Sequence, residues 1–237
     1  MHAALKDIPA RIFNVAVGAL IQANQHAVYY DPGMDHWTDM SVLNASMAGE
    51  LFLKAIIAKE HPLLIFRDLF QLDNPDSQEL NIEHLIETGK TYNFEHLPKL
   101  LWVSTGERLP DIDSFNRIRK ARNAIQHFCS PSEKIDLRYL SLEFLYKNVD
   151  PLINRHFGIC AIEYHEDTSI GYDYVVDCLI RNELLFSVPN RFKITEIDLV
   201  ESISKRSQSY KHKLIPRLAA KGVDVTKIKT ANRTKER

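Results

Sequence analysis

Apolar residues at helical spacing are the feature that most restricts the fold of this chain. Side chains that recur every three or four residues form one face of an amphipathic helix. Four segments show this spacing, at about residues 8–29, 41–60, 111–128 and 135–157. Because no clear period-two alternation occurs among them, the pattern predicts a mainly α protein in which residues 1–157 form a four-helix bundle.

Capping residues and prolines indicate where the first two helices begin and end. Asp7 is expected to cap the first helix, with Pro9 in its first turn. Asp39 or Ser41 is expected to cap the second helix, which stops before Pro62. Between residues 62 and 111 the pattern is less regular, and it predicts a loop with helical pieces, including a short helix near residues 79–88.

The third and fourth helices have similar signals. Residues 111–114 offer several capping side chains for a helix that continues to about Phe128, and Pro131 closes it. In the fourth helix, over residues 135–157, Pro151 predicts a kink or a break into two pieces.

Residues 158–221 are predicted to form a small accessory segment, α or α+β. Residues 184–188 and 191–194 have the composition of short strands, whereas residues 200–220 favour a helix. Residues 222–237 form a basic, polar tail that we expect to be flexible.

The overall composition is typical of a soluble globular protein. The 237 residues are 45% hydrophobic and 26% charged. The absence of both an 18-residue apolar run and a secretory signal predicts a cytoplasmic protein without a membrane partner. Cys129, Cys160 and Cys178 are widely spaced and form no CxxC, so we expect free thiols. No zinc template or glycine-rich nucleotide loop occurs, and we expect neither a metal nor a cofactor.

Charge is distributed unevenly along the chain. From residue 202 onward there are eleven Lys and Arg against two acidic residues, giving +9, and the preceding 201 residues carry −10. A basic end on an acidic body indicates an arm that binds nucleic acid, a tail that docks on its own body, or a solvated terminus.

The third helix separates its residues into an apolar and a polar face. With successive residues about 100° apart, one arc is expected to face the bundle core. That arc contains Ile118, Ala121, Ala124, Ile125 and Phe128. The opposite face contains Arg122, Gln126, Arg119, Asn123, His127 and Lys120. Arg can bind two phosphate oxygens in a bidentate fork, and an imidazole can transfer a proton near neutral pH, so this face suits a phosphodiester.

Arg122-Asn123, followed after three residues by His127, resembles the motif of the HEPN superfamily. A second-helix segment, residues 48–55, and a connector, residues 94–101, add to the resemblance, which extends over residues 1–157. The resemblance implies a helical bundle that pairs two motif helices at a homodimer cleft and cleaves RNA without metal. It also implies a toxin or phage-defence role with an antitoxin or defence-system partner, although some members are nucleotide-binding or scaffolding modules.

The mechanism that the resemblance implies is attack of the RNA 2′-hydroxyl on the adjacent phosphorus. His127 would act as general base or acid, Arg122 would stabilise the charge developing on the phosphoryl oxygens, and Asn123 would orient the imidazole or a phosphate. The products would be a 2′,3′-cyclic phosphate and a 5′-hydroxyl. Arg119, Gln126 and Glu50 would support this site. The candidates for phosphate contacts are Lys120, Lys205, Arg206, Lys211 and Lys213.

Other interpretations of these residues remain open at this point. The polar face could be an ordinary solvated helix surface. Glu50 and Lys54, four residues apart, could form only a structural ion pair. The chain could also be a non-catalytic helical module that binds a nucleotide or a protein, with the basic tail as a docking arm; such a module would not require His127.

Overall fold

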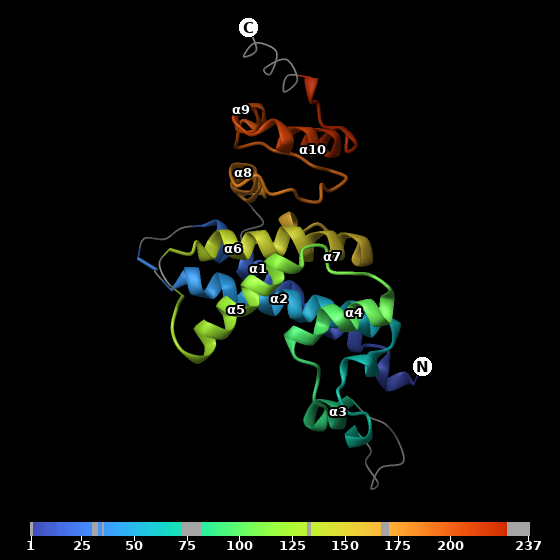
Figure 1. The fold of residues 1–237 in the computed structure, drawn as a ribbon. Helices are drawn as coiled ribbons and strands as arrows, with labels where there is room; N and C mark the ends of the chain where they lie inside the picture. The colour runs from blue at the N-terminus through green and yellow to red at the C-terminus, as the bar shows by residue number, and fades with distance from the viewer. Residues whose placement is uncertain are drawn as a thin grey trace.

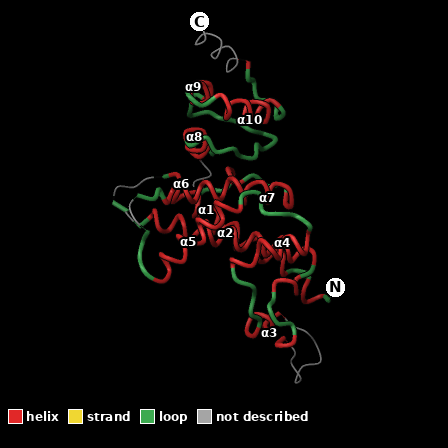
Figure 2. Tube along the Cα trace, viewed as in Figure 1, coloured by secondary structure: helices red, strands yellow, loops and turns green. Residues whose placement is uncertain are grey.

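The computed structural model describes residues 2–29, 33–34, 36–72, 82–131, 134–166 and 171–226. Over these residues the chain is helical, and its sole extended pairing is an isolated antiparallel bridge between Phe66 and Thr91 (Figures 1 and 2). The mainly α fold predicted from the sequence is therefore confirmed.

Two long helices form the centre of the molecule. Helices α1 (Ile8–Val28) and α2 (Trp37–Glu60) pack along their length, and α5 (Ile112–His127) and α6 (Leu137–Phe144) lie against α2 (Figure 1). Buried phenylalanines join these elements: the Phe94 ring contacts Phe115 of α5 at 4.6 Å and Phe144 of α6 at 6.0 Å between centroids. The result is a bundle-like arrangement with an aromatic core.

The first helix begins where the sequence predicts, but without the predicted side-chain cap, and the predicted start of the second helix is wrong. Asp7 makes no side-chain capping bond, although Pro9 does occupy the first turn of α1. Helix α2 begins at Trp37, before both predicted caps, and Ser41 is buried with its hydroxyl donating to Thr38 O at 2.7 Å. A serine that already bonds the preceding turn lies inside a helix, not at its start.

Helix α2 is long and apolar enough to resemble a membrane span by length and composition alone. In the most apolar 18-residue stretch of this helix, 67% is buried within the molecule. Its apolar character is thus accounted for by contacts with α1, α4, α5 and α6.

The region predicted as a loop contains more helix than expected. After 3-10 turns at Pro62–Ile65 and Phe70–Leu72, α3 spans Ile82–Thr88, and residues 79–81 of the helix predicted there lie outside the described residues. Helix α4 (Leu97–Thr105) was not predicted as a full helix. Its signals were present, because Pro98 lies in its first turn and Gly106, with φ 76°, ends it in the left-handed conformation.

Pro151 breaks the fourth predicted helix as expected. Helix α6 is followed by a π-helical turn, Leu145–Val149, and by α7 (Asp150–Phe157), in which Pro151 occupies the first turn. Proline cannot donate to the preceding turn and collides with the carbonyl four residues earlier, so the helix widens before it. Asp136 caps α6 by accepting from Tyr139 N.

The two predicted strands, 184–188 and 191–194, are wrong. Neither segment pairs with a strand within the described chain. Leu184, Phe186 and Val188 do alternate inward, which explains the strand-like pattern. Side chains take the place of a neighbouring strand: Tyr210 Oη donates to Leu184 O at 2.9 Å, and Arg217 Nη1 donates to Phe186 O at 3.3 Å.

The accessory segment is built from further short helices. Helix α8 (Asp173–Arg181) was not predicted, and the helix predicted over residues 200–220 is two helices, α9 (Leu199–Ser204) and α10 (Gln208–Ala219). Ser207 separates them by capping α10, with its Oγ accepting from Tyr210 N. Residues 227–237 of the predicted tail lie outside the described residues.

A buried carboxylate attaches this segment to the bundle. Asp150 of α7, 1% exposed, accepts from Ala161 N at 2.9 Å and from Ser187 N at 2.6 Å. Burial raises the pKa of Asp150, and the hydrogen bonds from these two amides oppose that rise. In Figure 1, α6 and α7 lie between two groups of helices. Helices α8, α9 and α10 are on one side, and α3 and α4 are on the other.

Candidate active site

Helix α5 is fixed at its start by side chains from the π-helical turn. Asp111 caps the helix by accepting from Ser114 N at 2.9 Å. Asn148 binds both backbone groups of Asp111, accepting from its N at 2.7 Å and donating to its O at 2.9 Å. Partial burial raises the pKa of Asp111, but the Ser114 hydrogen bonds and the Lys147 ammonium outweigh this effect and lower it. The predicted cap is therefore confirmed.

The core-facing residues of α5 are predicted only in part. Ile118 and Ala121 are buried as expected, and Ile125 is partly buried against the core. Phe115, which lay outside the predicted arc, is also buried. Phe128, predicted to face the core, is 90% exposed. The helix ends at His127, and Phe128 has φ −138° and ψ −82°, so the angular spacing of the helix no longer applies to it.

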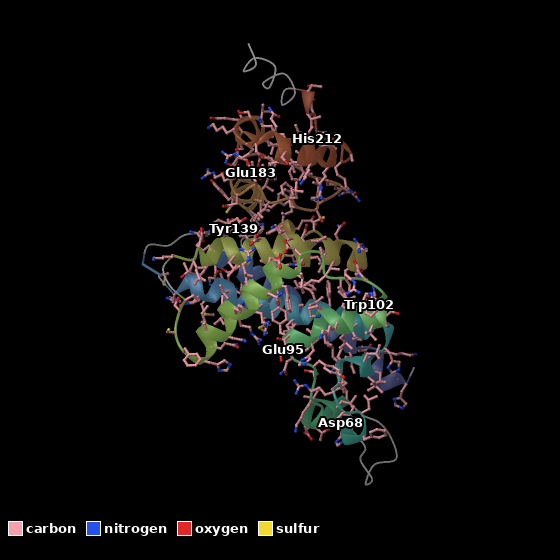
Figure 3. The ribbon with its side chains drawn as sticks, in the orientation of Figure 1. Asp68, Glu95, Trp102, Tyr139, Glu183 and His212 are labelled. Atoms are coloured by element: carbon pink, nitrogen blue, oxygen red, sulfur yellow. The ribbon has the colours of Figure 1, made fainter. Side chains whose placement is uncertain are left out.

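A cleft of about 340 Å³ opens along the polar face of α5. It is lined by all six residues predicted to be catalytic or supporting: Glu50, Arg119, Arg122, Asn123, Gln126 and His127. Its remaining wall comes from Asn93, Phe94 and Glu95, just before α4. Glu95 lies between α2 and α3 in Figure 3, on the side of the bundle opposite α10.

Arg122 is held at the inner wall of this cleft from two directions. Its Nη2 lies 3.3 Å from Glu50 Oε2, and its guanidinium carbon lies 5.7 Å from the centre of the Phe94 ring. Its side chain is 25% exposed, and that of Glu50 is 18% exposed. A guanidinium that lies over a ring and is paired on one edge still has N–H groups left for an anion.

Glu50 belongs to a longer polar chain. Lys54 Nζ donates to Glu50 Oε1 at 2.7 Å and to Thr91 Oγ1 at 3.0 Å. Glu50 therefore makes both of the contacts considered for it. It forms the i,i+4 ion pair with Lys54, and it also contacts Arg122 in the cleft.

The outer part of the cleft carries polar groups that are available to a ligand. In the described chain, the side chains of Asn123, Gln126 and His127 have no hydrogen-bond partner. Arg119 Nη1 lies 3.2 Å from Glu95 Oε2 at the rim. Two amides and an imidazole with unused capacity can bond to phosphate oxygens, ribose hydroxyls or base edges.

The predicted phosphate-contacting lysines and arginines do not gather at this cleft. Lys120 is exposed on α5 but does not line it. Lys205 pairs with Glu201 at 2.7 Å, and Arg206 bonds the carbonyls of Ser202 and Arg181. Lys211 is buried and donates to Ser204 O at 2.7 Å, while Lys213 lines a separate cleft.

Asn93, Phe94 and Glu95 were not predicted as site residues. They lie in and before a 3-10 turn, Phe94–His96, where helical periodicity carries no information. Their position depends on the burial of the Phe94 ring against Phe115 and Phe144, a contact between distant parts of the chain.

No group of three His, Cys, Asp or Glu side chains suited to a metal ion occurs within the described residues. Comparison with protein families, curated proteins and solved structures found no match for this chain. Any conclusion about function therefore depends on the geometry of the cleft and on the motif itself.

Proposed function

We propose that the cleft on α5 is a metal-independent RNA endonuclease site of the HEPN type. The observation that carries this proposal is the convergence of Arg122, Asn123 and His127 with Glu50 in one cleft of about 340 Å³. A positioned guanidinium and an unpartnered imidazole in one cleft can supply charge stabilisation and proton transfer, the two contributions that RNA transesterification requires.

In the proposed reaction the RNA supplies its own nucleophile. The 2′-oxygen attacks the adjacent phosphorus, the 5′-oxygen of the next nucleotide leaves, and a 2′,3′-cyclic phosphate forms. His127 removes the 2′-hydroxyl proton or protonates the leaving oxygen, and Arg122 binds the phosphoryl oxygens as their negative charge increases. Asn123 orients the phosphate or the imidazole, and Arg119 and Gln126 extend the surface that contacts RNA.

A homodimer is part of this proposal. Arg122 and His127 are five residues apart, about 140° around the helix, so one helix presents them imperfectly to a single phosphate. A second copy related by two-fold symmetry would bring the missing group. The Phe128 ring, directly after His127, is 90% exposed and would be available to such a contact.

The cellular setting in the proposal follows from the resemblance alone: a cytoplasmic toxin or phage-defence nuclease with a partner protein. The polar, unpartnered side chains of the cleft support binding of RNA, and they are equally compatible with a module that binds a nucleotide without cleaving it. His127 distinguishes the two activities.

The experiment is RNA cleavage by purified protein in EDTA, comparing His127→Ala with His212→Ala. His212 is an exposed histidine on α10, remote from the cleft (Figure 3). General acid-base catalysis contributes about 10²–10⁴-fold, so His127→Ala should lose about that factor while His212→Ala retains the wild-type rate. Equal rates for wild type and a folded His127→Ala would overturn the catalytic proposal. RNA binding without any cleavage would support the binding module instead.

A further inference from the structure

A second cleft, of about 600 Å³, lies between the bundle and the accessory segment. It is lined by residues 110–111 before α5, by residues 146–147 and 150–151, by residues 183–185 and 187, and by Ser207 and one side of α10. Glu183 of this cleft and Glu95 of the first cleft lie on opposite sides of α6 and α7 (Figure 3). The volume is within the range of sites for small molecules, about 300–1,000 Å³.

The three carboxylates that line this cleft already have partners within the protein. Asp111 accepts from Ser114 N and pairs with Lys147 at 3.2 Å. Asp150 accepts from two backbone amides, as described above. Glu183 accepts from Ser207 N at 2.7 Å and from Ser207 Oγ at 2.6 Å, at the start of α10. These bonds leave the carboxylates little tendency to bind a cation from solution.

The hydrogen-bond donors of the cleft, in contrast, are partly unused. Ser209, Lys213 and Arg217 lie at intervals of four residues along α10 and therefore share one face. In the described chain the side chains of Ser209 and Lys213 have no partner, and Arg217 gives one N–H to Phe186 O. Two cations and a hydroxyl with spare donors form a site for an anion.

The lining of the cleft also includes four apolar residues, Pro110, Pro151, Leu184 and Leu185. An inorganic ion would use only the donors of α10. A molecule that joins an anionic group to a carbon body would use both the donors and the apolar residues, and Arg217 could bind a phosphate group with two parallel N–H bonds.

We infer that this second cleft binds a small organic phosphate. Its phosphate lies against Ser209, Lys213 and Arg217, and its carbon body lies against Pro151 and Leu185. This site uses none of the residues of the α5 cleft, so the inference stands or fails independently of RNA cleavage.

The test is calorimetric titration of the full chain with adenosine 5′-monophosphate and ribose 5-phosphate, with adenosine and inorganic phosphate as single-component references. At least one organic phosphate should bind more tightly than either reference. Lys213→Gln should weaken that binding by about tenfold, since one charge-assisted bond is lost. Lys99→Gln, which changes an exposed lysine of α4 outside the cleft, should bind as the wild type does.

Because Lys213 is exposed and makes no hydrogen bond or ion pair in the described chain, its substitution should leave the fold intact, which the thermal unfolding temperature checks. Absence of binding by both organic phosphates, or binding no tighter than inorganic phosphate, would overturn the inference. Binding that survives Lys213→Gln and is lost in Arg122→Lys would also overturn it, because that result places the ligand in the α5 cleft.

Discussion

At the scale of single residues, Arg122 owes its orientation to two unlike neighbours. The Glu50 carboxylate, 3.3 Å away, fixes one edge of the guanidinium, and the buried Phe94 ring supports its face. A planar group held in this way loses little further freedom when it binds a phosphate, because its side chain is already ordered. Lysine has the same charge but neither the planar fork nor the stacking surface.

Arg122→Lys should therefore impair RNA cleavage, by roughly 10²–10³-fold, the scale of losing one preorganised donor to a developing anion. Arg108→Lys is the matched control, because the Arg108 guanidinium also stacks on a ring, 4.5 Å from the centre of Trp102, outside the cleft. Initial cleavage rates on one labelled RNA compare the two. A wild-type rate for Arg122→Lys would show that the bidentate fork has no part in the reaction.

At the scale of elements, the close approach of α2 and α6 places Glu50 in the cleft. Gly49, next to Glu50, lies directly against the Phe144 ring, and a Cβ built there would overlap that ring. Phe144 is fully buried and packs against Phe94 and Phe115, so moving its ring would disturb both contacts. A glycine is therefore required by packing at a helical position where alanine would otherwise be favoured.

Gly49→Ala should lower the free energy of unfolding by roughly 1–3 kcal/mol, because overpacking exceeds the gain in helix propensity of about 1 kcal/mol. Gly18→Ala on α1 is the control, since a Cβ there meets nothing within 4 Å, and it should be neutral or slightly stabilising. Urea unfolding followed by circular dichroism measures both variants. Equal stabilities would contradict the close packing of α2 on α6.

The elements also show what the sequence could predict. Local signals located α1, α5 and the break at Pro151, because the Asp111 cap and the proline act within a few residues. The extended segment after α8 was misassigned because its inward alternation is real, whereas its backbone partners, Asp150, Tyr210 and Arg217, are distant in sequence. The polar face of α5 was predictable because it follows from local helical spacing. The cleft wall containing Phe94 was not, because it depends on contacts between residues that are distant in sequence.

At the scale of the whole molecule, the proposed function pairs the α5 cleft of one copy with that of a second copy. Helix α5 ends at His127, and the next residue, Phe128, is 90% exposed. Burying such a ring against a second copy removes apolar surface from water, about 25 cal/mol per Å². Under the proposed function, that contact would also bring the second polar face of α5 close to the first.

Light scattering at micromolar concentration should therefore report a dimer. Phe128→Ser should shift the protein toward the monomer without changing its helical content, because the ring makes no core contact in the described chain. Val103→Ser, which changes an exposed apolar side chain of α4, serves as the control and should stay dimeric. A strict monomer for the wild type at these concentrations would contradict a shared site.

The central claim is that the α5 cleft cleaves RNA through its own side chains, and the ends of the RNA products test it most directly. Wild-type protein incubated with labelled RNA in EDTA should yield 2′,3′-cyclic phosphate and 5′-hydroxyl ends, because the 2′-oxygen is the nucleophile. RNA whose 2′-hydroxyl at the cleavage position is replaced by hydrogen should stay intact. Products with 5′-phosphate ends, or activity that EDTA abolishes, would contradict the account.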